Sequence, residues 1–169
     1  MNNTNSEKLN FILEATKARK HHGRSFFDHL LKTSGIVEKL CQQIGIEDSQ
    51  YLIDAALFHS IYGTDYYEFN AQISREKVVS LIGDRAEQLV YFFCSLTDRN
   101  IQILQHKFQP SLQKDLYILE YANLLEISLE DVQRTSALNP SKIFRLKLLR
   151  ANLRDHYKFN MPPIPFSFA

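Results

Sequence analysis

The chain has 169 residues, a length that fits one domain with a sizeable core and is short for two. Hydrophobic residues make up 44% and charged residues 23% of the sequence, values typical of a globular protein without a disordered half. Twenty basic and nineteen acidic side chains leave a net charge of +1, so the broad basic surface of a nucleic-acid-binding protein is missing. We therefore expect no nucleic acid as a partner.

The sequence shows neither a membrane-spanning segment nor a pattern of cysteines typical of disulfides. The sequence has no stretch of about 18 apolar residues, and its first residues lack the apolar run of a signal peptide. Cys41 and Cys94 each lie inside an apolar helical pattern, which favours reduced core thiols over a disulfide or a metal-thiolate site. We expect a cytoplasmic protein with no membrane partner.

The first predicted helix begins at Ser25. From there, apolar residues step alternately by four and three, with Thr33 between them, which predicts one buried stripe on a long helix. These residues are Phe26, Leu30, Val37, Leu40 and Ile44. Ser25 and Asp28 have the spacing of a capping box, which would supply partners for the first free amides.

Three more helices are predicted before residue 95. Leu52, Ala55, Ala56 and His59 occupy the buried positions of a helix over about 48–59, and a loop follows over 61–69. Ser74 can cap a helix that runs through Leu81. Asp84 and Glu87 have the capping-box spacing for the next helix.

After Pro110, the residues Leu112, Leu116, Leu119 and Asn123 step by four, three and four, so an amide lies on an apolar stripe. Asn139 and Pro140 are a plausible cap and first position for a last helix, before an aromatic and proline-rich tail. Only five glycines and five prolines occur, and three of the prolines fall in the last eight residues. We predict an all-α domain of about six to eight helices over 1–160 and an extended tail over 161–169.

Two histidines and one asparagine are the candidate site. His59 closes the buried face of its helix, and His29 lies near the inward stripe of the long helix, where Asn123 would add a third polar group. Burying an imidazole costs free energy unless its nitrogens are hydrogen-bonded or bind a metal. Each residue alone could be a hydrogen-bonded core residue, but the three together predict a polar interior site.

Hydroxyl groups follow His59 directly. Ser60, Tyr62 and Thr64 lie within five residues of it, and Gly63 can turn the chain at the helix end. They could form part of a catalytic site with His59, or they could belong to a packed helix stop.

Four further residues near the two histidines are candidate ligand-binding groups: His22, Arg24, Asp65 and Glu68. His22 could join His29 and His59 as a third imidazole ligand for Zn²⁺ or Fe²⁺. Arg24 could bind a phosphate or carboxylate with its fork of donors. Asp65 and Glu68 could supply a general base. The alternative for each is an ordinary exposed loop residue.

Other charged residues carry no predicted function. Asp98 and Arg99 are interpreted as a surface ion pair. The basic residues of the last helix are interpreted as its solvent-exposed side: Lys142, Arg145, Lys147 and Arg150.

Three segments together resemble the HD-domain family. Asp28-His29-Leu30 is similar to its first histidine segment, residues 55–60 (A-A-L-F-H-S) to its A-x-L-L-H-D segment, and Tyr121-Ala122-Asn123 to the segment of its last aspartate. The resemblance covers roughly residues 20–125, and residues 21–64 also resemble the hydrolase domain of (p)ppGpp enzymes. It implies a compact helical domain with a metal held by histidine, a histidine-aspartate pair and a distant aspartate.

Two acids of that metal set are absent. Ser60 stands at the position of the paired aspartate and Asn123 at that of the last aspartate. Mn²⁺ and Mg²⁺ prefer carboxylate ligands, so a site with two imidazoles and one amide should hold them weakly. Residues 59–64 instead resemble the H-S-x-Y-G-T signature of an uncharacterised HD-like subfamily.

Three functions remain open. The first is an HD-like small-molecule enzyme, a hydrolase or lyase, that uses buried histidines for acid-base chemistry or residual metal binding. The second is a non-catalytic HD-like module that binds a nucleotide-like or other anionic ligand. The third is a helical protein-interaction domain that uses Tyr66, Tyr67 and Phe69 or the tail. A cofactor, if there is one, would be a divalent Fe, Zn or Mn ion, and the sequence sets no oligomeric state.

Overall fold

The computed structural model describes residues 3–17, 20–21, 24–64, 73–105, 107–137 and 139–166. Within them the elements are α1 (Asn3–Thr16), β1 (Lys20–His21), β2 (Arg24–Ser25), α2 (Phe26–Ile44), α3 (Gln50–Phe58), α4 (Arg75–Ile82), α5 (Asp84–Ser95), α6 (Arg99–Gln102), the 3₁₀ turn η1 (Ile103–Gln105), α7 (Pro110–Thr135) and α8 (Pro140–Tyr157). The two strands form a short antiparallel pair. The prediction of an all-helical domain of six to eight helices is confirmed.

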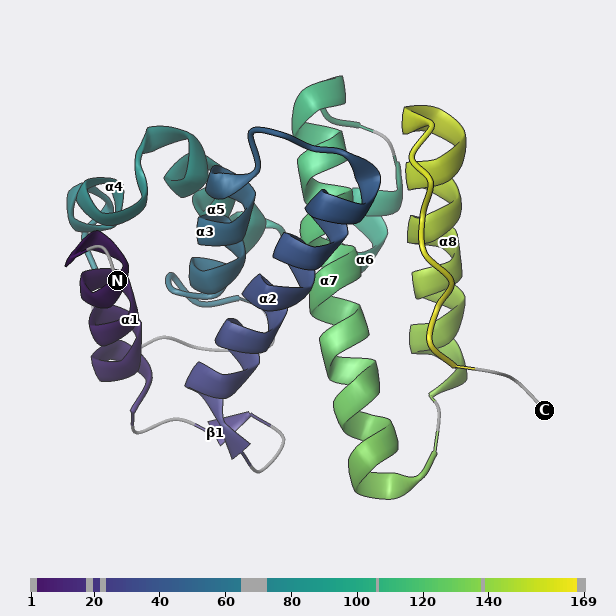
Figure 1. Cartoon of the computed structure of the whole chain (residues 1–169), viewed down its shortest axis with the longest axis horizontal. Helices are drawn as coiled ribbons and strands as arrows, with labels where there is room; N and C mark the ends of the chain where they lie inside the picture. The colour runs from purple at the N-terminus through teal and green to yellow at the C-terminus, as the bar shows by residue number, and fades with distance from the viewer. Residues whose placement is uncertain are drawn as a thin grey trace.

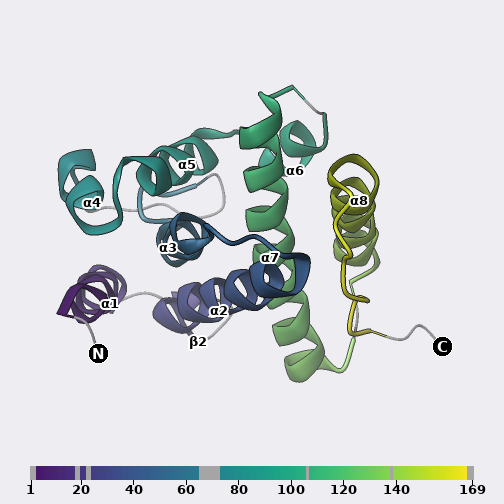
Figure 2. The same cartoon turned by 45° about the horizontal axis from the view of Figure 1, so that its top comes forward.

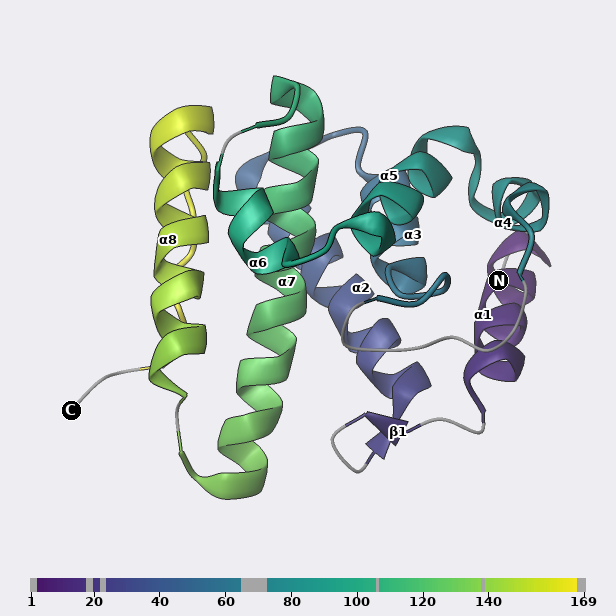
Figure 3. The same ribbon diagram turned by 180° about the vertical axis from the view of Figure 1, so that it is seen from behind.

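Helix α7 is the central element of the fold. Figures 1 and 2 show it between α8 on one side and α2, α3 and α5 on the other, with α1 and α4 farther out. Seen from behind in Figure 3, α6 lies beside α7 on the side of α8. Because α7 contacts both halves of the molecule, polar groups on its two sides face different neighbours.

Helix α2 has the buried stripe that the sequence predicts. Phe26, Leu30, Val37 and Leu40 are almost fully buried, and they form the core together with residues of α3, α5 and α7. The helix ends at Gly45, whose φ of 75° is a left-handed conformation that favours glycine. The apolar periodicity therefore explains the buried face of α2, and Gly45 explains where the helix ends.

Two predicted helix caps are confirmed and two are wrong. Ser74 Oγ accepts from the amide of Lys77, and Asn139 Oδ1 accepts from the amides of Ser141 and Lys142. Ser25 precedes α2 without a side-chain cap, and α5 begins after Gly83 rather than through a capping box. Glu87 is instead bonded to side chains of other elements.

Three features lie beyond the sequence predictions. The apolar pattern predicts neither α1, which buries Ile12, nor the four-residue α6. The chain after α8 turns back along that helix (Figure 1), where Met161 is buried and Arg150 donates to the carbonyls of Met161 and Pro162. Among the described helices, none is long and apolar enough to cross a membrane.

Candidate functional site

The centre of the candidate site is a contact between two histidines. His29 lies in the first turn of α2, and His59 caps the C-terminal end of α3. Their Nε2 atoms are 3.3 Å apart, and the side chains are almost fully buried, at 2% and 1% exposure. Helices α2 and α3 pack against each other, so two residues from different parts of the sequence meet at their interface.

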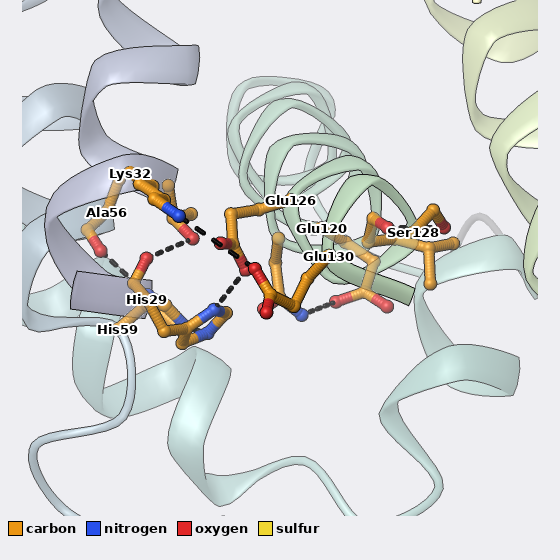
Figure 4. A network of polar contacts seen from close by, with 11 residues as sticks. His29, Lys32, Ala56, His59, Glu120, Glu126, Ser128 and Glu130 are labelled. Carbon is orange, nitrogen blue, oxygen red and sulfur yellow. Dashed lines mark hydrogen bonds and ion pairs between the residues drawn. The ribbon is translucent and has the colours of Figure 1, made fainter. Parts of the chain in front are cut away.

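The other nitrogen of each ring has its own partner. His29 Nδ1 lies 2.6 Å from Glu126 Oε2 of α7, and His59 Nδ1 lies 2.6 Å from the carbonyl oxygen of Ala56. Figure 4 shows the His29 ring pointing to the Glu126 carboxylate. A carboxylate and a carbonyl both accept, so each Nδ1 carries a hydrogen and both Nε2 atoms face the contact. A hydrogen bond between them needs one further proton.

The histidine pair lines a cavity of about 270 Å³ between α2, α3, α6, α7 and α8. This volume is close to the lower end of small-molecule sites, about 300–1,000 Å³. Its lining combines apolar, cationic and hydroxyl-bearing residues: Phe26, His29, His59, Ser60, Thr64, Arg99, Asn100, Glu120, Asn123, Leu124, Ile127, Lys142 and Arg145. A site of this size and polarity suits a polar small molecule.

Three of the other predicted site residues also line this cavity. Ser60 and Thr64 follow His59, and Asn123 lies on α7, where its amide Nδ2 donates to Glu120 at 3.2 Å. Ser60 and Asn123 are each 5% exposed. The structure thus brings Ser60, Thr64 and Asn123 to the same space as the histidines.

Tyr62 has a different environment. Its hydroxyl donates to Glu87 Oε1 at 2.9 Å, outside the cavity lining, and Arg75 donates twice to the same carboxylate at 2.6 Å. Burial alone would raise the pKa of Glu87, but the hydrogen bonds from Arg75 and Tyr62 outweigh it and leave the pKa lowered. This group ties the chain after α3 to α4 and α5.

Several predicted residues lie outside this description. His22, Asp65 and Glu68 lie outside the described residues, as do Tyr66, Tyr67 and Phe69. Arg24 is described only as part of the strand β2. Their candidate roles stay predictions.

Arg99 corrects one sequence interpretation. It is 6% exposed and lines the cavity, so it is not part of a surface ion pair. Its Nε lies 3.4 Å from Glu120 Oε2, and its guanidinium stacks over Phe93 at 4.0 Å from the ring centroid. Asp98, with φ 45° and ψ 39°, turns the chain into α6 and so directs Arg99 inward.

Three of the four basic residues of α8 need a second correction, while Lys147 is exposed as predicted. Lys142 and Arg145 line the cavity rather than a solvent-exposed face, and Arg150 bonds the returning tail. Arg145 Nη2 lies 2.8 Å from Glu120 Oε1 and also donates to Asn100. The apolar residues Ile143, Leu146 and Leu149 of α8 repeat every three residues. A residue between them, such as Arg145, can therefore flank the buried stripe. This spacing was the signal in the sequence that could have predicted a partly buried Arg145.

Two buried glutamates of α7 complete the site and were not predicted. Glu120 and Glu126 are each 2% exposed, one beside the arginines and the other beside His29. Acidic residues on an apolar helix stripe were the signal that could have found them, because buried charges require partners.

Cys94 is close to the site but is not a candidate nucleophile. Its thiol donates to the carbonyl of His59 at 3.2 Å, and burial raises its pKa to about 12. A thiol is a good nucleophile only as a thiolate. Cys94 therefore supports the backbone of His59.

Among the residues that the structure describes, two positions fit an HD-type metal. A separation of 3.3 Å between two Nε2 atoms suits two ligands of one ion, and each ring is oriented through its Nδ1. Ser60 and Asn123 supply no anionic ligand, and Glu120 and Glu126 are held by arginines and by His29. Among the described residues, no group of three or more His, Cys, Asp or Glu side chains could hold a metal ion. This donor set does not fit the carboxylate-rich site of that family.

The all-helical fold around this histidine pair is similar to that of a solved structure. A solved structure of a metazoan ortholog of SpoT, described as hydrolysing ppGpp and acting in starvation responses, is similar, with a TM-score of 0.62 at 19% identity. The similarity covers 92% of this chain and 88% of the other. The chain belongs to the family described as a domain of unknown function, DUF6817, whose model matches residues 12–99. No curated protein matches the sequence.

Proposed function

We propose that the chain is an HD-like enzyme that acts on a small molecule and uses His29 and His59 to transfer protons. The contact of the two Nε2 atoms inside the cavity carries this proposal, since each Nδ1 already has an acceptor. General acid-base catalysis requires a donor and an acceptor within hydrogen-bond reach of the reacting group. Two imidazoles that share one proton supply one of each, and histidine exchanges protons near neutral pH.

The proposed reaction is hydrolysis. One imidazole accepts a proton from water while the water oxygen attacks the substrate, and the other, as imidazolium, donates its Nε2 proton to the leaving oxygen. Glu126 balances the positive charge of the pair through Nδ1 of His29. Ser60, Thr64 and Asn123 orient the substrate with their hydroxyl and amide groups. Phosphorylated nucleotides are the first candidates, because the similar solved structure belongs to a protein described as hydrolysing ppGpp.

The test is a turnover assay with nucleotides, including ppGpp, and with other phosphorylated metabolites, followed by substitution of the pair. In His59→Asn, the amide can still donate to the Ala56 carbonyl, while the group at Nε2 is lost. We expect turnover to fall by about a hundredfold or more without loss of the folded domain, as followed by circular dichroism. The exposed His156 provides the control His156→Asn, which should keep wild-type turnover.

Two results would contradict this proposal. One is wild-type turnover in both His29→Asn and His59→Asn. The other is a loss of activity that only follows the loss of folded protein, because His59 would then be a core residue.

A non-catalytic module that binds an anionic ligand is the second candidate. It is favoured by the neutral Ser60 and Asn123 at the positions where the HD family has acids. Ligand binding in calorimetry without any product over hours would support it, and turnover of that ligand would exclude it.

A further inference from the structure

We infer that Arg99 is the anion-binding residue of the cavity, and that the bound small molecule carries an oxyanion, either a phosphate or a carboxylate. The side chain of Arg99 makes no hydrogen bond within the described part of the chain, although only 6% of the residue is exposed. Its Nε is buried without an acceptor. A buried donor without a partner is costly, so a ligand oxygen that accepts from this guanidinium would remove that cost.

The nearest carboxylate does not satisfy Arg99. Glu120 Oε2 lies 3.4 Å from Nε without a hydrogen bond, while the same carboxylate accepts from Arg145 at 2.8 Å and from Asn123 at 3.2 Å. One buried acid is thus shared by two arginines, which leaves a surplus positive charge among these three side chains. Removing charges from water is costly unless they are balanced. An anionic ligand would supply the missing charge.

The geometry of Arg99 suits an oxyanion. The guanidinium of Arg99 lies over the ring of Phe93, and this contact holds it in place from one side. The planar fork of an arginine matches the oxygens of a phosphate or carboxylate, which it can bind through two parallel hydrogen bonds. The short helix α6 carries Arg99, together with Asn100, into the lining of the cavity.

Arg99 also explains how the ligand would be placed for reaction. Arg99, His29 and His59 line one cavity, so an anion held by Arg99 shares that space with the proton-transferring pair. The assignment of the cavity as a substrate site rests on the proposed function. The binding of the anion does not, because it can be measured without turnover.

The experiment measures binding of inorganic phosphate, and in a second arm of acetate, to the full chain by NMR titration or calorimetry. We expect saturable phosphate or acetate binding to wild type, and Arg99→Gln should weaken it about tenfold or more, as the loss of charged hydrogen bonds predicts. Arg154→Gln is the matched control, because Arg154 is an exposed arginine of α8 outside the cavity lining. It should bind as wild type does. The stronger arm identifies the anion as phosphate or carboxylate.

Arg99→Lys keeps the charge but loses the fork, and it decides the question if Arg99→Gln fails to fold. We expect an intermediate loss of about threefold. The inference is overturned if wild type binds neither anion, or if every folded Arg99 variant binds as tightly as wild type. The two proposals can fail separately: if His59→Asn keeps wild-type turnover while Arg99→Gln loses the anion, the proposed function fails and the anion site stands.

Discussion

Glu126 Oε2 lies 2.6 Å from Nδ1 of His29, although 97 residues separate the two in the chain. Both side chains are almost fully buried. A carboxylate on Nδ1 orients the ring, fixes the hydrogen on that nitrogen and stabilises positive charge on the imidazole. His29 Nε2 in turn contacts His59 Nε2. The Glu126 carboxylate of α7 therefore also affects the charge of the histidine pair, whose two residues come from α2 and the end of α3.

Glu126→Gln tests this relationship. The amide keeps the shape of the side chain but removes the charge that balances the histidine pair, so we expect turnover to fall on the order of a hundredfold. The ring nitrogen NMR shifts of His29 should change with it. Glu130→Gln, one turn later on α7, is the matched control, because Glu130 faces Lys32 at 3.8 Å. Equal turnover in both variants would show that Glu126 does not act through His29.

Substitutions of Tyr62 and Ser60 should distinguish a residue that stabilises the fold from a residue that contacts the ligand in the cavity. Tyr62→Phe removes the hydrogen bond to Glu87 and should lower the free energy of unfolding by about 1 kcal/mol with turnover unchanged. Ser60→Ala removes a hydroxyl that lines the cavity and should raise KM with little change in stability. Urea denaturation and steady-state kinetics measure both effects, and the reverse pattern would contradict this assignment.

Glu87 should contribute stability that depends on pH. Its folded pKa is lowered relative to its ordinary value of 4.5, because its hydrogen bonds outweigh burial. The contribution is therefore fully present above pH 4.5 and is lost as the pH falls through the folded pKa. Glu87→Gln should be less stable than wild type by about 1–3 kcal/mol near pH 7.

That difference in stability should shrink in acid. Urea denaturation of wild type and Glu87→Gln at several pH values measures it. Asp48→Asn is a control, since Asp48 is an exposed partner of Arg85 and should give a small difference that varies little with pH. A Glu87→Gln difference that grows as the pH falls would contradict a lowered pKa of Glu87 in the folded state.

Metal content provides a further check. Two imidazoles with a serine hydroxyl and an asparagine amide should hold Fe, Zn or Mn weakly. We expect purified protein to carry well under one equivalent in elemental analysis, and chelator treatment to leave its melting temperature unchanged. One full equivalent that is lost together with turnover would contradict proton transfer by the histidine pair alone.

Helical periodicity accounts for much of the fold. The stripes of α2 and α7 identify buried faces because a helix must cover its apolar side, and Ser74 and Asn139 mark starts through their own side chains. Ser25 makes no side-chain cap, and the capping box at Asp84 is wrong because a local motif competes with tertiary partners. Glu87 gains more from Arg75 and Tyr62 than it would from a helix amide.

The sequence by itself determined the all-helical class and the inward positions of His29, His59 and Asn123, because these follow from local spacing and residue type. Only the tertiary structure decided that Glu126 lies beside His29 and that Arg99 and Arg145 share Glu120. Those partners come from distant helices. A charged residue shows in the sequence that it needs compensation, but packing alone selects the partner that provides it.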